Sequence, residues 1–254
     1  MEDHDTIETF PWTPCPTKDI GLSNEDVHVW CLPLRVSKNL YQSLSPILSI
    51  DEISRARRFR IEKDRHCFTV KRAFLRTIIS YYTDLRPQNV VFSHNGYGKP
   101  SLDPTLDSNA SINFNTSRSS DVAIFAITRN RDVGIDIEKI RDIDDIETIV
   151  EDFFPDVEKR YFSSLASEKK LEVFYVLWTR MEAVLKAQGI GFLSSNEGRI
   201  DLVTTLIPEY EKADMLKWRI WSFCPMPGYI ASFALDGQAA QITCFDLNSF
   251  EGLL

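Results

Sequence analysis

VGIDIE, residues 133–138, is the stretch that decides how this chain folds. Its alternating pattern predicts a β-strand, in which successive side chains point to opposite faces. The period of two places Asp136 and Glu138 on one face and sends Ile135 and Ile137 into the core on the other. Two parallel carboxylates repel each other, and a divalent cation or a shared proton relieves the repulsion. The strand is therefore a candidate Mg²⁺ site, although an exposed strand with two outward acids has the same pattern.

Further along the chain, WTRMEAVLKAQG at residues 178–189 has the spacing of an amphipathic helix. Gly189 stands where helices usually end. Glu182 and Lys186 are four residues apart, so they share one face of this helix. Taken alone, such a pair is an ordinary surface ion pair, which stabilises a helix by only a few tenths of a kcal/mol.

Working outward, the two halves of the chain share an order of elements. Strands are expected at 27–34, 90–93, 111–115, 121–128, 218–223, 229–235 and 241–247, and helical segments at 50–59, 68–82 and 168–188. IDEISRARRF (50–59) resembles FPDVEKRYF (154–162), and VAIFAITRN (122–130) resembles YIASFALDG (229–237). This favours a duplicated unit, although any two amphipathic halves look somewhat alike. We expect an α+β protein of two similar α/β lobes with a cleft between them, divided into an irregular lead-in (1–26), an N-terminal lobe (27–130) and a C-terminal lobe (131–254).

Composition limits the classes of function. The 254 residues are 43% hydrophobic and carry a net charge of −8, enough for one large core or two small ones. The acidic balance argues against nucleic-acid or anionic-membrane binding. The N-terminus, MEDHDTIETF, has no apolar core of a signal peptide, and no apolar run reaches membrane-spanning length. Five cysteines without a CxxC pair suggest reduced thiols, and we expect a cytoplasmic protein.

Local charge departs from this average in two blocks. Residues 51–76 hold nine Lys or Arg against four acids, whereas residues 132–158 hold eleven acids against two bases. Either block is consistent with a solvated face, but the basic one is also a candidate pocket for a monophosphate. FNTSRSSD at 114–121 is expected to be a tight loop whose hydroxyls, amides and Arg118 suit a diphosphate, or else a plain hairpin turn.

Together these motifs resemble one family. GIDIE, a spacer of 39 residues and WxxxEAxxK are similar to the signature of the 4′-phosphopantetheinyl transferases. Gly98-Lys99-Pro100 and Phe114-Asn115-x-Ser117 resemble the N-terminal motifs of the family's Sfp-type branch, and the resemblance covers about residues 27–235. It implies a pseudo-dimeric monomer of two lobes. It also implies transfer of phosphopantetheine from coenzyme A to a serine of an apo acyl or peptidyl carrier protein, with release of 3′,5′-ADP, as in the holo-[acyl-carrier-protein] synthases.

The resemblance also implies roles for single residues. The implied Mg²⁺ (or Mn²⁺) ligands are Asp136, Glu138 and Glu182; the implied catalytic residues are Asp136, Lys186 and Glu182, the last also a candidate base; and the implied coenzyme A contacts are Arg55, Gly98, Lys99, Pro100, Ser117, Arg118 and Lys186.

Two positions depart from the family pattern. Arg118 replaces the usual histidine, and Met181 replaces a basic residue, with Arg180 one step earlier. One helical step is about 100°, so Arg180 is not expected to take that place. Two alternatives stay open: a binding module for coenzyme A or carrier proteins with impaired catalysis, and another Mg²⁺-dependent phosphotransferase. The absence of a GxxxxGK[ST] loop counts against a P-loop kinase.

Overall fold

The computed structural model describes residues 7–16, 20–103, 105, 112–190, 218–237 and 241–247. The helices are α1 (Lys38–Leu44), α2 (Ile50–Arg57), α3 (Glu62–Ser80), α4 (Ile146–Phe153), α5 (Asp156–Ser164) and α6 (Ser167–Gln188), with the short 3₁₀ helices η1 (Ser45–Ile47) and η2 (Pro87–Asn89). The strands are β1 (Trp12–Pro14), β2 (Asp26–Pro33), β3 (Phe92–His94), β4 (Pro100–Leu102), β5 (Ile112–Ser119), β6 (Val122–Arg129), β7 (Val133–Lys139), β8 (Trp218–Phe223), β9 (Tyr229–Asp236) and β10 (Gln241–Asp246). Residues 191–217, between the helix expected at 168–188 and the strand expected at 218–223, lie outside the described residues.

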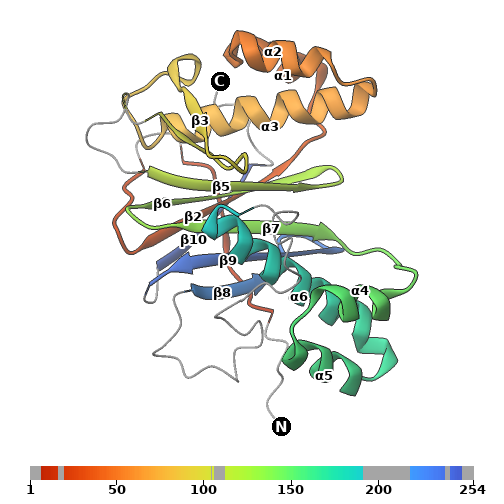
Figure 1. Ribbon diagram of the computed structural model, residues 1–254. Helices are drawn as coiled ribbons and strands as arrows, with labels where there is room; N and C mark the ends of the chain where they lie inside the picture. Colours follow the sequence, from red (N-terminus) through yellow and green to blue (C-terminus); the bar gives the residue numbers. More distant parts are fainter. Residues whose placement is uncertain are drawn as a thin grey trace.

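The first sheet carries the helices of the N-terminal half. Its described strands have the order β1-β10-β2-β6-β5. Helix α3 runs along one face of this sheet (Figure 1), and its Phe74 belongs to the same buried core cluster as Trp30 of β2 and Phe125 of β6. Helix α2 precedes α3 and begins with a capping box, in which Ser49 and Glu52 satisfy each other's backbone amides.

The second sheet has the described order β7-β9-β8, and α6 packs against it. Gly134 allows the helix to approach, because a Cβ built there would lie 2.0 Å from the carbonyl oxygen of Ala183. The other face of β7 presents Ile135 and Ile137, both fully buried against the first sheet, as its alternation predicted. Helix α6 ends at Gly189, whose φ of 72° is left-handed, so that prediction is confirmed too.

The two halves repeat one arrangement, and the expected α+β class with two similar lobes is confirmed. A short helix precedes a long one in each half, α2 before α3 and α5 before α6. Strands β6 and β9 are each interior in their described sheet and antiparallel to both neighbours. The sequence resemblances noted above fall on α2 and α5 and on β6 and β9.

The sheets do not follow the order of the chain throughout. The boundary expected between residues 130 and 131 falls between β6 and β7, but β10, from the end of the chain, pairs in parallel with β2. The lead-in expected to be irregular contributes β1, which pairs with β10. Strands β1 and β10, from opposite ends of the described chain, therefore complete the edge of the N-terminal sheet.

Two local expectations were wrong. Residues 116–119, expected to be a tight loop, continue strand β5, and the hairpin turn, which was the alternative, follows at Ser120, whose φ is 51°. The acidic block of residues 132–158 contains helix α4, which was not among the expected helices. In the described part of the chain, no helix is long and apolar enough to cross a membrane.

Candidate active site

The two sheets meet where β5 lies beside β7, a place we call the junction. No backbone ladder joins these strands in the described structure; side chains of β5 bond to β7 instead. The Asn115 side-chain oxygen accepts from the amide of Ile135 at 3.0 Å, and the Ser119 hydroxyl accepts from the amide of Lys139 at 3.0 Å. Because Asn115 and Ser119 are an even number apart on a strand, they point the same way, with Ser117 between them.

Ser117, Asp136 and Lys186 form a hydrogen-bonded cluster at the centre of the junction. The Ser117 hydroxyl donates to Asp136 Oδ1 at 2.7 Å. The Lys186 ammonium donates to the same oxygen at 2.5 Å and to the Ser117 hydroxyl at 3.0 Å. Asp136 is 3% exposed rather than open to a cleft, and among the described atoms its Oδ2 is buried without a hydrogen-bond partner. Three of the predicted site residues, from β5, β7 and α6, are therefore brought together.

Glu138 and Glu182 flank this cluster. Glu138 accepts a hydrogen bond of 2.7 Å from Ser119. Burial raises the pKa of Glu138, and the charge of Asp136 raises it further. Burial likewise raises the pKa of Glu182, with Asp136 and Glu138 adding to the rise and Lys186 opposing it. The three carboxylates thus interact and lack a full counter-charge.

The donor set fits a magnesium ion in chemistry. Carboxylate oxygens are the ligands that Mg²⁺ prefers, and the buried Oδ2 of Asp136 has no other partner among the described atoms. The carboxylate oxygens are not gathered around one point. In the described ranges, no three acidic, His or Cys side chains lie close enough together to hold a metal ion. In this arrangement the ammonium of Lys186 is the cation beside Asp136.

Gly98, Lys99 and Pro100 lie apart from the Asp136 cluster, in the hairpin of β3 and β4. Gly98 occupies its turn with a φ of 86°. The ammonium of Lys99 donates to the carbonyls of Ala187 (2.9 Å) and Val133 (3.3 Å), so it caps α6 and is not directed at a ligand. Lys99 and Pro100 line a pocket of about 250 Å³ between the two halves of the chain.

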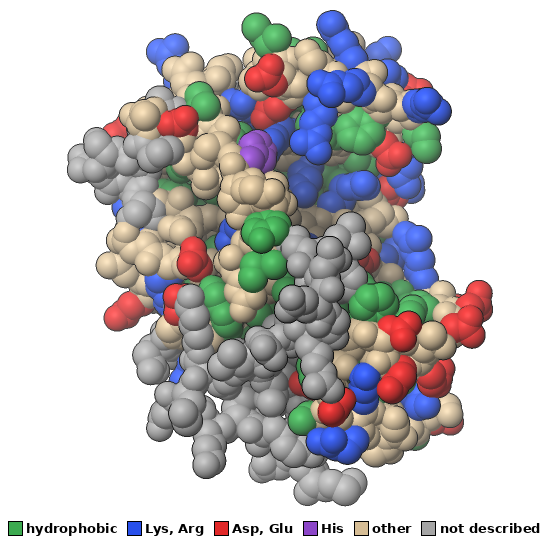
Figure 2. Space-filling view, in the orientation of Figure 1, with side chains coloured by type: hydrophobic (Ala, Val, Ile, Leu, Met, Phe, Trp, Pro, Cys, Tyr) green, Lys and Arg blue, Asp and Glu red, His purple; other side chains and the backbone are tan. Residues whose placement is uncertain are grey.

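The predicted arginines face α3. Arg118 is exposed and donates to the carbonyl of Ser120 at 3.1 Å, and its charge acts on Cys67 of α3. Because Arg118 and Ser117 are consecutive on a strand, they point to opposite faces, so Arg118 does not join the Asp136 cluster. Arg55 of α2 lies over the ring of Phe68, 5.4 Å from its centre. Figure 2 shows that Lys and Arg side chains gather around α2 and α3, whereas acidic ones gather around α4 and α5.

The departures on α6 are buried. Met181 is fully buried in the core between α6 and its neighbours. Arg180 is 3% exposed, and its Nε donates to the Ser222 hydroxyl at 2.7 Å. As its helical position predicted, Arg180 points away from the junction and does not replace the basic residue.

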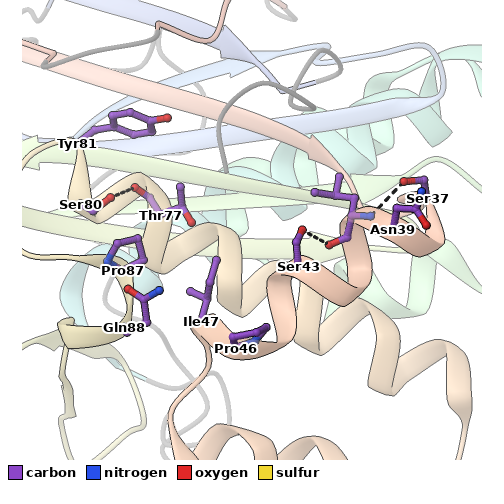
Figure 3. A pocket seen from close by; sticks show the side chains of 11 residues that line it. Ser37, Asn39, Ser43, Pro46, Ile47, Thr77, Ser80, Tyr81, Pro87 and Gln88 are labelled. Carbon is purple, nitrogen blue, oxygen red and sulfur yellow. Dashed lines mark hydrogen bonds between the residues drawn. The ribbon is translucent and has the colours of Figure 1, made fainter.

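A larger hollow lies elsewhere. It has a volume of about 790 Å³ between α1, η1 and the end of α3. Figure 3 shows hydroxyls such as Ser43 turned back toward their own helix, where Ser43 donates to the carbonyl of Leu40. The described residues that line it include no charged side chain and none of the predicted site residues, so size does not identify the site.

Sequence reasoning missed three residues of this region. Ser119 and Asn115 bond to β7 as described above, and alternation from Ser117 would have found both had the stretch been taken as a strand. Asn95 donates to the carbonyl of Gly189 at 2.9 Å and accepts from the amide of Lys99, which ties the hairpin to the end of α6. Its only signal was the Asn-Gly turn pattern.

Comparison with known proteins agrees with the geometry. A family model described as 4′-phosphopantetheinyl transferase superfamily matches residues 132–234, and one described as 4′-phosphopantetheinyl transferase, N-terminal matches residues 35–130. The chain is 33% identical over 226 residues to 4′-phosphopantetheinyl transferase HetI of Nostoc sp., covering 89% of this chain and 94% of HetI.

Shorter matches join two further relatives. Identity is 31% over 161 residues with 4′-phosphopantetheinyl transferase Sfp of Bacillus subtilis, covering 63% of this chain and 67% of Sfp. It is 31% over 160 residues with 4′-phosphopantetheinyl transferase gsp of Aneurinibacillus migulanus, covering 63% of this chain and 64% of gsp. With the similarity to HetI spanning nearly the whole chain, and with motif residues of both halves meeting at one junction, this chain belongs to the 4′-phosphopantetheinyl transferase family.

Proposed function

We propose that this protein transfers the 4′-phosphopantetheine group of coenzyme A to a serine of an apo acyl or peptidyl carrier protein, as a holo-[acyl-carrier-protein] synthase does. The products are the holo carrier protein and 3′,5′-ADP. The observation that carries the proposal is the cluster of Ser117, Asp136 and Lys186, because it joins motifs from both halves of a chain of this family.

In this proposal each residue type has a chemical task. The carrier serine oxygen attacks the β-phosphorus, and the bond from that phosphorus to the 3′,5′-ADP oxygen breaks with its electron pair. Glu182 takes the serine proton, and its raised pKa makes it a stronger base than an exposed glutamate. Lys186 moves its charge from Asp136 toward the diphosphate, with Ser117 as a neighbouring donor.

Asp136, Glu138 and Glu182 would hold Mg²⁺. The ion, when bound, neutralises the diphosphate and the leaving group. The buried Oδ2 of Asp136 supports this, since an unpaired buried carboxylate oxygen is costly. Mn²⁺ has the same preference for oxygen ligands and is proposed as a substitute.

For coenzyme A, we propose that Arg55 binds the 3′-phosphate and that the backbone of Gly98–Pro100 borders the nucleotide. The pocket between the two halves supports the second assignment, whereas the Lys99 ammonium, held by two carbonyls, contributes through position only. Arg118 is proposed as a further phosphate contact from the face of β5 toward α3.

We also propose that the protein acts as a monomer, because one chain supplies both sides of the junction. A reducing compartment such as the cytoplasm is proposed from its five free cysteines. Light scattering coupled to gel filtration tests the first proposal, with a dimer as the contradicting result.

The function is tested by mass spectrometry of apo carrier proteins incubated with coenzyme A and Mg²⁺. The panel takes carriers from fatty-acid, polyketide and peptide synthetases, and matched samples contain EDTA or the Asp136→Ala variant. We expect the phosphopantetheine mass on at least one carrier with the wild-type protein only. Coenzyme A binding without transfer to any carrier would favour a binding module, and hydrolysis of coenzyme A would favour another phosphotransferase.

A further inference from the structure

Ser119 of β5 makes two hydrogen bonds to β7, although the family resemblance assigns it no role. Its hydroxyl donates to Oε2 of Glu138 at 2.7 Å and accepts from the backbone amide of Lys139 at 3.0 Å. A serine hydroxyl carries one proton and two lone pairs, whereas an amide N–H can only donate. The amide of Lys139 therefore occupies a lone pair of the hydroxyl, and the single hydroxyl proton is left for Glu138.

This contact belongs to a regular alignment of β5 with β7, in which Glu138 lies 19 positions after Ser119. Ser117 donates in the same way to Asp136, which also lies 19 positions further on. Asn115 and Ser119 each accept from a backbone amide 20 positions further on. A constant offset means that the two strands run in the same direction without a slip in register. The period of two on both strands therefore brings one serine to each carboxylate.

The two serines differ in what holds their hydroxyl groups. The Ser117 hydroxyl accepts from the ammonium of Lys186 at 3.0 Å, a side chain that is proposed to move toward the diphosphate. The Ser119 hydroxyl accepts from a backbone amide of β7 instead, and β7 is held in place by its ladder with β9. Ser119 is 9% exposed, so water has little access to its bonds. Ser119 is thus a fixed support for its carboxylate, whereas the bonds of Ser117 depend on the position of Lys186.

A glutamate needs such a support more than an aspartate does. Its side chain has three rotatable bonds, so an unrestrained Glu138 would lose more conformational freedom on binding an ion. Carboxylates that ligate metals are themselves hydrogen-bonded, and these outer partners orient them. Because the Ser119 hydroxyl gives its only proton to Oε2, it does not engage Oε1 of the same carboxylate. The bond therefore orients Glu138 through one oxygen and leaves the second oxygen to another ligand.

We propose that Ser119 is a positioning residue, which orients Glu138 as a ligand of the divalent cation. The proposal rests on the proposed function for the role of Glu138. A role in joining the strands only, through the amide of Lys139, is the alternative that the experiment must separate. Since Ser119 does not touch the substrate in this account, its loss should act on metal binding and not on the chemical step at saturating metal.

The test compares Ser119→Ala, which removes the hydroxyl, with Ser119→Thr, which keeps it. Paramagnetic resonance measures the Kd of Mn²⁺ alone, without coenzyme A, and transfer assays at increasing Mg²⁺ give the half-saturating concentration and kcat. We expect Ser119→Ala to raise both the Kd and the half-saturating concentration about tenfold. Its kcat at saturating Mg²⁺, and the metal affinity of Ser119→Thr, should stay within about threefold of the wild-type values.

The matched control is Ser222→Ala, which removes a buried hydroxyl of β8 that accepts from Arg180 at 2.7 Å, outside the junction. It should lower the Tm but leave the Kd of Mn²⁺ unchanged, so it separates lost stability from lost positioning. A double variant then identifies the group through which Ser119 acts. In Glu138→Ala, the further change Ser119→Ala should shift the Kd by less than about twofold, because the carboxylate that the hydroxyl orients is already gone.

An unchanged Kd in a folded Ser119→Ala variant would overturn the proposal. So would a tenfold effect that persists in Glu138→Ala, or a wild-type protein that binds Mn²⁺ no better than Asp136→Ala does. If thermal melting shows that Ser119→Ala does not fold, Ser119→Cys replaces it; its thiol is a weak donor, and its Kd should be raised at least about threefold. If the wild-type protein modifies no carrier, the proposed function fails, while the Mn²⁺ titrations still decide whether Ser119 positions Glu138.

Discussion

Strands β2 and β7 each pair with one of the two interior strands that resemble each other, β2 with β6 and β7 with β9, yet they carry opposite chemistry. β2 lies between β10 and β6, and its residues are buried and apolar apart from His28 and its ends. β7 is bonded to a described strand on one side only, β9, and its other side faces the hydroxyls of β5. An interior strand must bury every side chain, whereas an edge strand can hold carboxylates where a partner strand supplies polar groups. In the repeated scaffold, the site therefore lies where β7, an edge strand of the second sheet, faces β5, an edge strand of the first sheet.

The largest effect should come from removing the acid of β7. Asp136→Ala should lower transfer at least about 10³-fold, or about 4 kcal/mol, because it removes a proposed metal ligand and the partner of Lys186. Carrier modification followed by mass spectrometry measures the rate, and circular dichroism checks the fold. Cys31→Ala, which truncates a buried side chain of β2, is the control and should stay within about twofold. Turnover near the wild-type value in Asp136→Ala would remove Asp136 from the site.

The next effect tests how closely β7 approaches α6. Gly134→Ala should destabilise the protein by about 3 kcal/mol and lower the Tm by about 6–12 °C, because the new Cβ would lie 2.0 Å from the Ala183 carbonyl oxygen and 2.3 Å from the Ala187 amide nitrogen. Gly21→Ala near β2 is the matched control, since among the described atoms none lies within 4 Å of its Cβ position. Equal melting temperatures for the two variants would contradict this account of the helix–strand contact.

A third effect belongs to His28, the histidine inside β2. Burial lowers the pKa of His28 to about 4. As the pH falls from about 6.5 toward 4, the unfolded chain takes up a proton that the folded protein does not, so unfolding becomes easier. The loss is about 1.4 kcal/mol per pH unit and about 3 kcal/mol in total, and this stability is fully present above pH 6.5.

Urea unfolding at several pH values measures this slope. The control variant is His28→Gln, which keeps a polar group near the Tyr82 hydroxyl that His28 contacts at 2.9 Å. It should reduce the slope of unfolding free energy against pH by up to about 1.4 kcal/mol per pH unit, which is the contribution of one proton. The comparison of slopes does not depend on how much the substitution costs at neutral pH. Parallel curves for the wild type and the variant would show that His28 takes up its proton in the folded state.

The smallest effect concerns the other face of β5. Arg118→His should make coenzyme A affinity fall about threefold more than in the wild type between pH 6 and 8, because a histidine loses its charge there and an arginine does not. Calorimetry with coenzyme A and Mg²⁺ at several pH values measures the difference. Superimposable curves of equal affinity would leave Ser117 as the ligand-facing residue of β5 and Arg118 as a hairpin contact.

Much of the site could be predicted from short patterns. The period of two in VGIDIE set which face carries Asp136 and Glu138, and the spacing of Glu182 and Lys186 set one face of α6. Both rules depend only on local backbone geometry, so they hold wherever the chain packs. The roles of Lys99 and Arg118 could not be predicted in this way, because the first caps α6 and the second points toward α3.

The sequence by itself determined the α+β class, the duplicated order of elements and the residues that the site draws on. Only the tertiary structure decided that β5 and β7 meet through side chains and that β10 leaves its own half to pair with β2. The reason is that periodicity fixes the face of a strand or helix but not its neighbour. The neighbours of an element follow from how the buried faces of the whole chain pack. The sequence alone therefore does not distinguish the nine Lys and Arg residues of 51–76 by their surroundings.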